Sequence, residues 1–170
     1  YDRDLYRHWV DADGDCQDTR QEVLIAESLE PVEMDERGCR VVSGSWFDAF
    51  TGQTFTDPSS LDIDHMIPLA EAHRSGAAAW NAEQREAFAN DLFNDDALIA
   101  VSASVNRSKS DRDPAEWLPP DPGYRCEYLQ KWILVKAAWS LSMGPEETLA
   151  VRIGLLGCTP RPQPPTTQQP

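Results

Sequence analysis

The stretch that decides the fold is Leu61-Asp62-Ile63-Asp64-His65-Met66-Ile67-Pro68-Leu69. Apolar and acidic residues alternate from Leu61 to Asp64, which predicts the end of a β-strand, and Pro68 stops that strand. Because successive side chains of a strand point to opposite faces, Asp64 and His65 should meet different surroundings. One can hold a hard metal ion while the other faces a water molecule, which is the arrangement that a metal-assisted hydrolase needs.

The composition is that of one folded domain. The chain has 170 residues, of which 41% are hydrophobic and six are tryptophan, so it can bury a sizeable core. No apolar run reaches the roughly 18 residues of a membrane span, so we expect no membrane partner. The net charge is −14, and residues 1–67 hold 16 acidic and 5 basic residues. Such acidity disfavours general nucleic-acid binding, although bound cations would change the balance.

Four cysteines occur without a Cys-x-x-Cys pair, and the chain has only three histidines. This usage argues against a zinc ribbon and for two disulfides, and therefore for a secreted, extracellular protein. Three pairings are open. We favour Cys16–Cys39 with Cys126–Cys158, because each bond then tethers a local unit without crossing the middle of the chain.

An acidic loop follows the N-terminal segment. Counting Asp11 as position 1, acids fall at positions 1, 3, 5 and 12, which are ligand positions of an EF-hand calcium loop. The departure is position 6, where that loop has Gly and this chain has Cys16. The alternative is a solvated acidic turn ending in a helix N-cap at Asp18 or Thr19. The expected calcium ligands are Asp11, Asp13, Asp15 and Glu22.

The remaining patterns predict mostly helices. A hairpin should join residues 40–50 and 53–56 around Thr51-Gly52, and a buried strand should cover residues 97–103. From residue 159 the chain is rich in Pro, Gln and Thr, which predicts a disordered or extended tail over 159–170. Helices are predicted over residues 1–10, 20–29, 69–74, 81–91, 124–141 and 145–156.

A second informative stretch contains the densest basic cluster of the chain, Asn106-Arg107-Ser108-Lys109-Ser110-Asp111-Arg112. Together with Asp64-His65-x-x-Pro68-Leu69, it resembles the HNH branch of the His-Me finger (ββα-metal) nucleases. A wider set of stretches resembles one group of secreted bacterial HNH-family nucleases and covers about residues 1–158. Those stretches are Trp9 to Asp15, Thr19 to Leu24, Asp62 to Ala70, Phe88 to Asp91 and Asn106 to Pro119.

The resemblance implies an α+β fold with a ββα-metal core over about residues 60–118. An N-terminal helix and hairpin would extend this core, C-terminal helices would cover it, and the disulfides would staple it. Residues 1–158 would form a single nuclease domain and act as a monomer. The implied function is a metal-dependent endonuclease that hydrolyses phosphodiester bonds in DNA with little sequence preference, because no base-reading module is visible. Cleavage of RNA is left open.

The resemblance also assigns roles to matching positions. His65 would be the general base, and Asp64 with Asn106 would complete the catalytic set by holding one divalent ion, usually Mg²⁺, with Mn²⁺ as the alternative. Arg107 and Lys109 would lie beside the phosphate backbone. With an ordinary pKa near 6.5, His65 should lose activity as the pH falls through that value.

Several of these residues have a simpler reading. Taken alone, Arg107 and Lys109 would be solvated helix residues. Arg20 could also reach a phosphate, but a salt bridge to nearby acids is the stronger expectation. Asp62 could support Asp64 or be a plain surface acid. Many HNH motifs have a middle Asn where this chain has Ala97, and Asn94 is the nearest substitute.

Two other functions compete with a DNA nuclease. In a secreted calcium-binding or adhesion domain, the acidic loop would be the function and Asp64-His65 incidental. An RNA-only nuclease or toxin would cut RNA and leave plasmid DNA intact. Exposure of plasmid DNA and RNA to the protein with a panel of metals separates the three.

Overall fold

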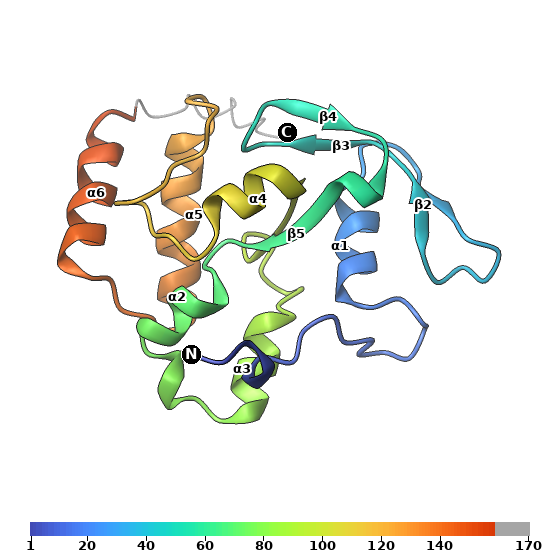
Figure 1. The fold of residues 1–170 in the computed structure, drawn as a ribbon, viewed down its shortest axis with the longest axis horizontal. Helices are drawn as coiled ribbons and strands as arrows, with labels where there is room; N and C mark the ends of the chain where they lie inside the picture. Colours follow the sequence, from blue (N-terminus) through green and yellow to red (C-terminus); the bar gives the residue numbers. More distant parts are fainter. Residues whose placement is uncertain (159–170) are drawn as a thin grey trace, which may run out of the picture.

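The computed structural model describes residues 1–158, and the tail predicted over 159–170 lies outside this range. Helices and three short antiparallel sheets form the fold, with two long helices at one side and the hairpins at the other (Figure 1). None of the helices in the described part is long and apolar enough to cross a membrane.

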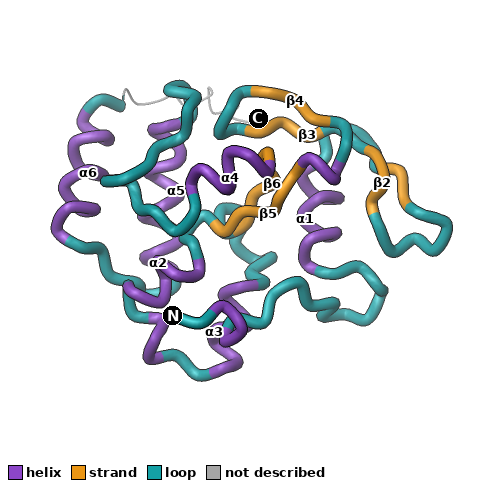
Figure 2. Tube along the Cα trace, in the orientation of Figure 1, coloured by secondary structure: helices purple, strands orange, loops and turns teal. Residues whose placement is uncertain are grey.

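The centre of the fold is a two-stranded sheet followed by a helix. Strand β5 (Leu61–His65) pairs antiparallel with β6 (Leu98–Ser102), so that Asp64 lies opposite Ile99 and His65 opposite Leu98. Helix α4 (Ala103–Lys109) follows β6 directly and turns back across β5 (Figure 2). Both strands were predicted within a residue of each end, since their alternating and apolar patterns are strong.

Two further hairpins lie on the N-terminal side. The turn at Thr51-Gly52 connects β3 (Trp46–Asp48) to β4 (Gln53–Phe55), as the sequence predicts. The preceding residues do not extend that hairpin. Instead β2 (Val41–Ser43) pairs with β1 (Glu33–Met34), in an additional hairpin that the sequence patterns did not predict.

The helices cover the central sheet from both sides. Five of them match predicted segments with ends shifted by no more than about three residues, as is usual for fraying termini. A side-chain cap at Asp18 opens the first helix, because its carboxylate accepts the Gln21 amide. The helices other than α4 are α1 (Thr19–Glu27), α2 (Leu69–Arg74), α3 (Ala82–Ala89), α5 (Arg125–Ala138) and α6 (Pro145–Leu156), and the 3₁₀ turns are Arg3–Leu5, Pro58–Ser60 and Ala77–Ala79.

The N-terminal segment differs from its prediction. A helix was expected over residues 1–10, but only the 3₁₀ turn Arg3–Leu5 forms. Tyr6 points inward and is fully buried, whereas Leu5 is 45% exposed. Trp9 has a positive φ of 59°, which an α-helix excludes. The segment therefore lies as an irregular strap across α3, and tertiary contacts decide its shape.

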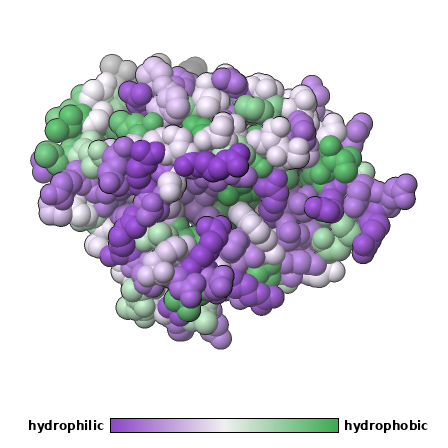
Figure 3. Space-filling view, in the orientation of Figure 1, coloured by the Kyte–Doolittle hydropathy of each residue, from purple (hydrophilic) through white to green (hydrophobic). Residues whose placement is uncertain are grey.

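Two apolar clusters hold these elements. One lies between α1 and the outer face of the β5–β6 sheet, and it includes Leu24, Trp46 and Ile63. The other surrounds α5 and includes Phe88, Tyr128 and Trp132. Hydrophilic residues cover most of the face seen in Figure 3, and apolar residues reach the surface beside α6.

Both expected disulfides are present. Cys16 is bonded to Cys39, which ties the acidic loop to the β1–β2 hairpin. Cys126 is bonded to Cys158, which ties the first turn of α5 to the end of α6. No free cysteine remains. The pairing chosen from the sequence is therefore confirmed.

Candidate active site

Strand β5 places its last two side chains on opposite faces, as predicted for a strand end. Asp64 points toward α4, and His65 points toward α3. Both are almost fully buried, with 5% and 7% of their surface exposed. Burial of a carboxylate and an imidazole beside each other is costly unless each has a partner, so the partners define the site.

The partner of His65 is a backbone carbonyl. The Nε2 atom lies 2.9 Å from the carbonyl oxygen of Ala89, at the end of α3. A carbonyl can only accept, so Nε2 carries the proton and the neutral ring keeps its lone pair on Nδ1. Burial, with smaller contributions from nearby cations, lowers the pKa of His65 to about 3. The imidazole is thus neutral at physiological pH. Its pKa is lower than the ordinary value near 6.5 that was expected from the sequence.

The partner of Asp64 is Lys109, from the last turn of α4. The Lys109 ammonium lies 2.7 Å from Asp64 Oδ2 and donates to the backbone oxygen of His65 at the same distance. Burial raises the pKa of Asp64 and lowers the pKa of Lys109, while the charge of each opposes the shift of the other. Lys109 is completely buried. Its predicted contact with a phosphate backbone is therefore wrong, because the ammonium faces the interior.

Asn106 lies one turn earlier on α4 and is oriented by a second acid. Its amide nitrogen donates to Asp62 Oδ2 at 3.0 Å. This bond fixes which end of the amide is the nitrogen, and it leaves the Asn106 carbonyl oxygen without a donor among residues 1–158. Asp62 thus supports the site by orienting Asn106, and it is not simply a surface acid.

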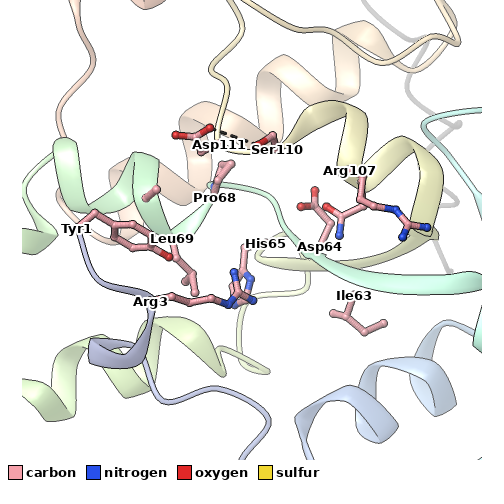
Figure 4. Close-up of a pocket in the computed structure, with 12 residues that line it drawn as sticks. Tyr1, Arg3, Ile63, Asp64, His65, Pro68, Leu69, Arg107, Ser110 and Asp111 are labelled. Atoms are coloured by element: carbon pink, nitrogen blue, oxygen red, sulfur yellow. Dashed lines mark hydrogen bonds between the residues drawn. The ribbon is translucent and has the colours of Figure 1, made fainter.

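These groups meet at one cavity of about 430 Å³. Figure 4 shows Asp64 and Arg107 on one side of it and His65 and Arg3 on the other. Arg107 is exposed, and its Nε atom donates to the Ala103 carbonyl, one turn back on α4. Neither arginine has a carboxylate within ion-pair distance in the described residues, so the cavity has two cationic walls.

The donor set fits a divalent cation. Asp64 Oδ1 and the Asn106 carbonyl are hard oxygen atoms that line the same cavity, and no donor within residues 1–158 occupies them. Asp48 and Asp62 also act on Asp64 electrostatically. A divalent ion bound at Asp64 would offset this repulsion among the carboxylates.

Two other sequence candidates lie away from this cavity. Arg20 donates from one guanidinium nitrogen to the carbonyls of Pro58 and Leu61, at 2.9 and 3.0 Å. Within the described residues it forms no salt bridge, contrary to the expectation, and it ties α1 to the start of β5. Asn94 accepts the Asp96 amide within its own loop and lines a separate cavity near Glu27. It does not replace the middle Asn.

The acidic loop brings its predicted carboxylates together on the surface. Oxygen atoms of Asp11, Asp13 and Asp15 lie within 4.8 Å of one another, and all three residues are exposed. Glu22 has a raised pKa, caused first by partial burial and then by the charges of these three acids. Cys16, at the position usually taken by Gly, has a φ of 76°, the left-handed conformation that the turn requires.

Sequence reasoning missed two supports of His65. The Ala89 carbonyl carries no side-chain signal, so only the fold could reveal it. Trp9 stacks against the imidazole, with ring centroids 5.8 Å apart. It stands within a stretch that resembles the secreted nucleases, but that resemblance assigned it no role.

Comparisons with known proteins place the chain in a family. The family described as GmrSD restriction endonucleases, C-terminal domain, matches residues 16–144, which include every residue of the site except Arg3 and Trp9. A protein of Arthroderma benhamiae described as an uncharacterized secreted protein is 43% identical over 158 residues, covering 93% of this chain and 76% of its own length. No solved structure matches.

These matches bear on two expectations. The extracellular location predicted from the cysteines is confirmed, since the relative is a secreted protein and both disulfides are formed. The family indicates a nuclease-type function. The relative is fungal, whereas the resemblance seen in the sequence was to bacterial proteins.

Proposed function

This chain belongs to the family of GmrSD restriction endonuclease C-terminal domains, and from that premise we propose that it is a secreted, metal-dependent endonuclease. The reaction is hydrolysis of phosphodiester bonds, and β5, β6 and α4 serve as a ββα-metal core. The observation that carries the proposal is one cavity lined by a neutral imidazole, a carboxylate, an amide oxygen and an arginine: His65, Asp64, Asn106 and Arg107.

His65 is the general base. The Ala89 carbonyl holds the proton on Nε2, so the Nδ1 lone pair is free to take a proton from the attacking water. Because the low pKa keeps the ring neutral, the base needs no prior deprotonation. His65 also lies where two cationic residues, Lys109 and Arg3, disfavour its protonated form before reaction.

Asp64 and Asn106 would hold one divalent ion, with Mg²⁺ as the first choice and Mn²⁺ as the alternative. When bound, the ion would supply positive charge to the phosphoryl oxygen and the leaving oxygen. Lys109 orients the Asp64 carboxylate by occupying Oδ2, and Asp62 orients the Asn106 amide by accepting its N–H. Both ligands are therefore fixed before substrate binds, which is what preorganisation requires.

The substrate is DNA, and RNA is the second candidate. Arg107 reaches the cavity from the exposed face of α4, where its free N–H groups can bind a phosphate oxygen. A net charge of −14 gives the rest of the molecule little attraction for a polyanion. Binding should therefore depend on the metal and on the few cations around the cavity, with little reading of base sequence.

The test is cleavage of supercoiled plasmid DNA and of a structured RNA by the full chain, with Mg²⁺, Mn²⁺ or Ca²⁺ after chelator treatment. We expect plasmid nicking with Mg²⁺ or Mn²⁺ and none with chelator present. Cleavage of RNA alone would redirect the assignment to a ribonuclease. Intact DNA and RNA with every metal would refute the nuclease and leave the secreted calcium-binding or adhesion domain.

We further propose that the loop Asp11–Glu22 holds a structural calcium ion. Support comes from the clustered oxygens of Asp11, Asp13 and Asp15 and from the nearby Glu22 carboxylate. The left-handed turn at Cys16 also favours the loop shape, with the disulfide to Cys39 anchoring it. This ion would stabilise the fold and take no part in cleavage.

A further inference from the structure

Two aromatic rings stack against the imidazole of His65. The Trp9 ring centroid lies 5.8 Å away with its plane inclined by 25°. Phe88, from α3, lies at 6.4 Å and 22°. Both are offset-stacked arrangements within the usual distance range for aromatic pairs. Phe88 is a buried core residue, whereas Trp9 comes from the irregular N-terminal strap and is only half-buried.

The backbone at Trp9 is strained. Its φ of 59° lies in the left-handed region, which a bulky residue rarely adopts. Strain of this kind persists only where surrounding contacts impose it. The surroundings of Trp9 must therefore supply those contacts.

One side chain supplies them on both sides of Trp9. Asn90 donates from Nδ2 to the carbonyl of Arg7, and its Oδ1 accepts the backbone amide of Val10. These bonds, at 2.8 and 3.1 Å, bracket the strained residue. The Thr19 hydroxyl also lies 2.8 Å from Asn90 Oδ1, and a second Nδ2 bond reaches the carbonyl of Glu86. Asn90 is thus fully bonded, and it follows directly after Ala89, whose carbonyl binds His65.

We propose that Trp9 is a positioning residue for His65, and that Asn90 clamps the strap so that the indole stays against the imidazole. The inference rests on the proposed role of His65 as the base. A single hydrogen bond to Ala89 fixes one atom of the ring but not the plane of the ring. Near-parallel stacking of Phe88 and Trp9 on the imidazole restrains that plane.

The first experiment tests whether His65 needs an aromatic ring at position 9 or only an apolar side chain. Trp9→Leu keeps an apolar side chain without a ring, and Trp9→Phe keeps a ring. We expect kcat for plasmid nicking to fall by about 10- to 100-fold in Trp9→Leu, because a small misplacement of a catalytic group is costly, with KM nearly unchanged. Trp9→Phe should restore most of kcat.

The second experiment reads the ring itself and needs no activity. In metal-free protein, NMR should find the carbon-bound protons of His65 shifted by the ring currents of Trp9 and Phe88, and ¹⁵N shifts should report protonation at Nε2 alone. Trp9→Leu should lose part of the ring-current shift and mix the two tautomers, and Trp9→Phe should not. Wild-type values in Trp9→Leu would overturn the proposal, whether or not the protein cleaves nucleic acid.

The clamp has a matched control on the same helix. Asn90→Ala removes the bonds to the strap, whereas Asn81→Ala removes the N-cap at the other end of α3 and does not touch the strap. Both should lower the unfolding midpoint, but only Asn90→Ala should reproduce the kcat and NMR changes of Trp9→Leu. Equal effects of the two variants on kcat, or none from Asn90→Ala in folded protein, would contradict the clamp.

Discussion

Two regions of this molecule gather carboxylates, and they do so in opposite environments. At the end of β5, Asp64 is 5% exposed and has an ammonium, Lys109, at 2.7 Å. In the loop after Trp9, Asp11, Asp13 and Asp15 are exposed, and none of them has an ion-pair partner within residues 1–158. Both are proposed cation sites, but only the first has a cation of its own.

The two environments impose different requirements on a cation site. A buried carboxylate costs several kcal/mol, so the fold must compensate it before any ion arrives, and Lys109 does so. Exposed carboxylates are solvated, and their repulsion is screened by water and salt. The buried site is therefore built by the fold, whereas an ion bound in the loop would help to build its own site.

The largest effect should come from removing the proposed base. His65→Ala leaves Asp64 and Asn106 in place, so metal should still bind while plasmid cleavage drops by about 10² to 10⁴. Asn106→Ala removes a ligand, so added Mg²⁺ should recover part of its activity, and Asp64→Ala should lose metal more completely. Cleavage rate against Mg²⁺ concentration, with calorimetry for metal binding, measures this.

His73→Ala is the matched control for that variant. His73 contacts the Tyr6 hydroxyl at 3.0 Å and does not line the cavity. The His73→Ala variant should cleave plasmid DNA at nearly the wild-type rate. If His65→Ala also cleaved near the wild-type rate, His65 would not be the general base. The buried cluster at the end of β5 would then have a structural role only.

Removing the internal cation should destabilise the buried region. Lys109→Met leaves the Asp64 carboxylate buried and unpaired, which should lower the free energy of unfolding by about 3–5 kcal/mol. The double change Lys109→Met with Asp64→Leu should recover much of this loss, because no charge is then left. Urea denaturation at neutral pH measures both.

The control for Lys109 is an exposed ion pair. Arg7 and Glu86 are 3.5 Å apart with 72% and 40% of their side chains exposed. Arg7→Met should therefore cost only about 0–1 kcal/mol. A comparable loss for Lys109→Met and Arg7→Met would mean that Asp64 is not compensated by Lys109.

The exposed region should respond to calcium instead. At about 100 times the dissociation constant, a bound ion stabilises the fold by about 2.7 kcal/mol, and Tm should rise by several degrees after chelator treatment. Asp13→Ala with Asp15→Ala should abolish the rise and keep the Mg²⁺ requirement for cleavage. Thermal melts with and without calcium measure the effect.

Removal of two acids elsewhere tests whether the rise is specific. Glu30 and Glu36 are exposed and lie outside the loop, so Glu30→Ala with Glu36→Ala changes the charge equally. That variant should keep the calcium response. An unchanged Tm of the stripped wild-type protein in calcium would return the loop to a solvated acidic turn.

The smallest effect is the pH dependence of stability. Since the pKa of His65 is about 3 in the fold and about 6.5 when unfolded, the unfolded chain binds more protons between these values. Stability from this group is complete above about pH 6.5 and falls as the pH drops toward 3. The loss at about pH 5 is about 2 kcal/mol.

The comparison of wild type with His65→Gln isolates the contribution of His65 to the pH dependence of stability. Urea midpoints at about pH 7.5 and about pH 5 should fall more in wild type than in the variant, which cannot take up the proton. The cleavage rate should show no decline near pH 6.5 from protonation of His65. Equal pH dependence of the two midpoints would place the histidine pKa near its ordinary value.

The sequence by itself predicted the strand Leu61–His65 and the strand after it, and it favoured the disulfide pairing that forms over the two other possible pairings. Alternation and apolar runs are local patterns, and they predict a strand wherever it packs. The same alternation set Asp64 and His65 on opposite faces. Spacing alone also grouped Asp11, Asp13 and Asp15, because a short loop keeps such residues close.

Only the tertiary structure decided what these residues touch. Lys109 was predicted to lie beside a phosphate, but α4 turns its side chain under β5, where Asp64 is its partner. Burial lowers the pKa of His65, and the Ala89 carbonyl, 24 residues away, opposes that shift while fixing the proton on Nε2. The strap that carries Trp9 is not helical, because bonds to Asn90 outweigh its local helical pattern. Such effects depend on residues distant in sequence, and local patterns cannot encode them.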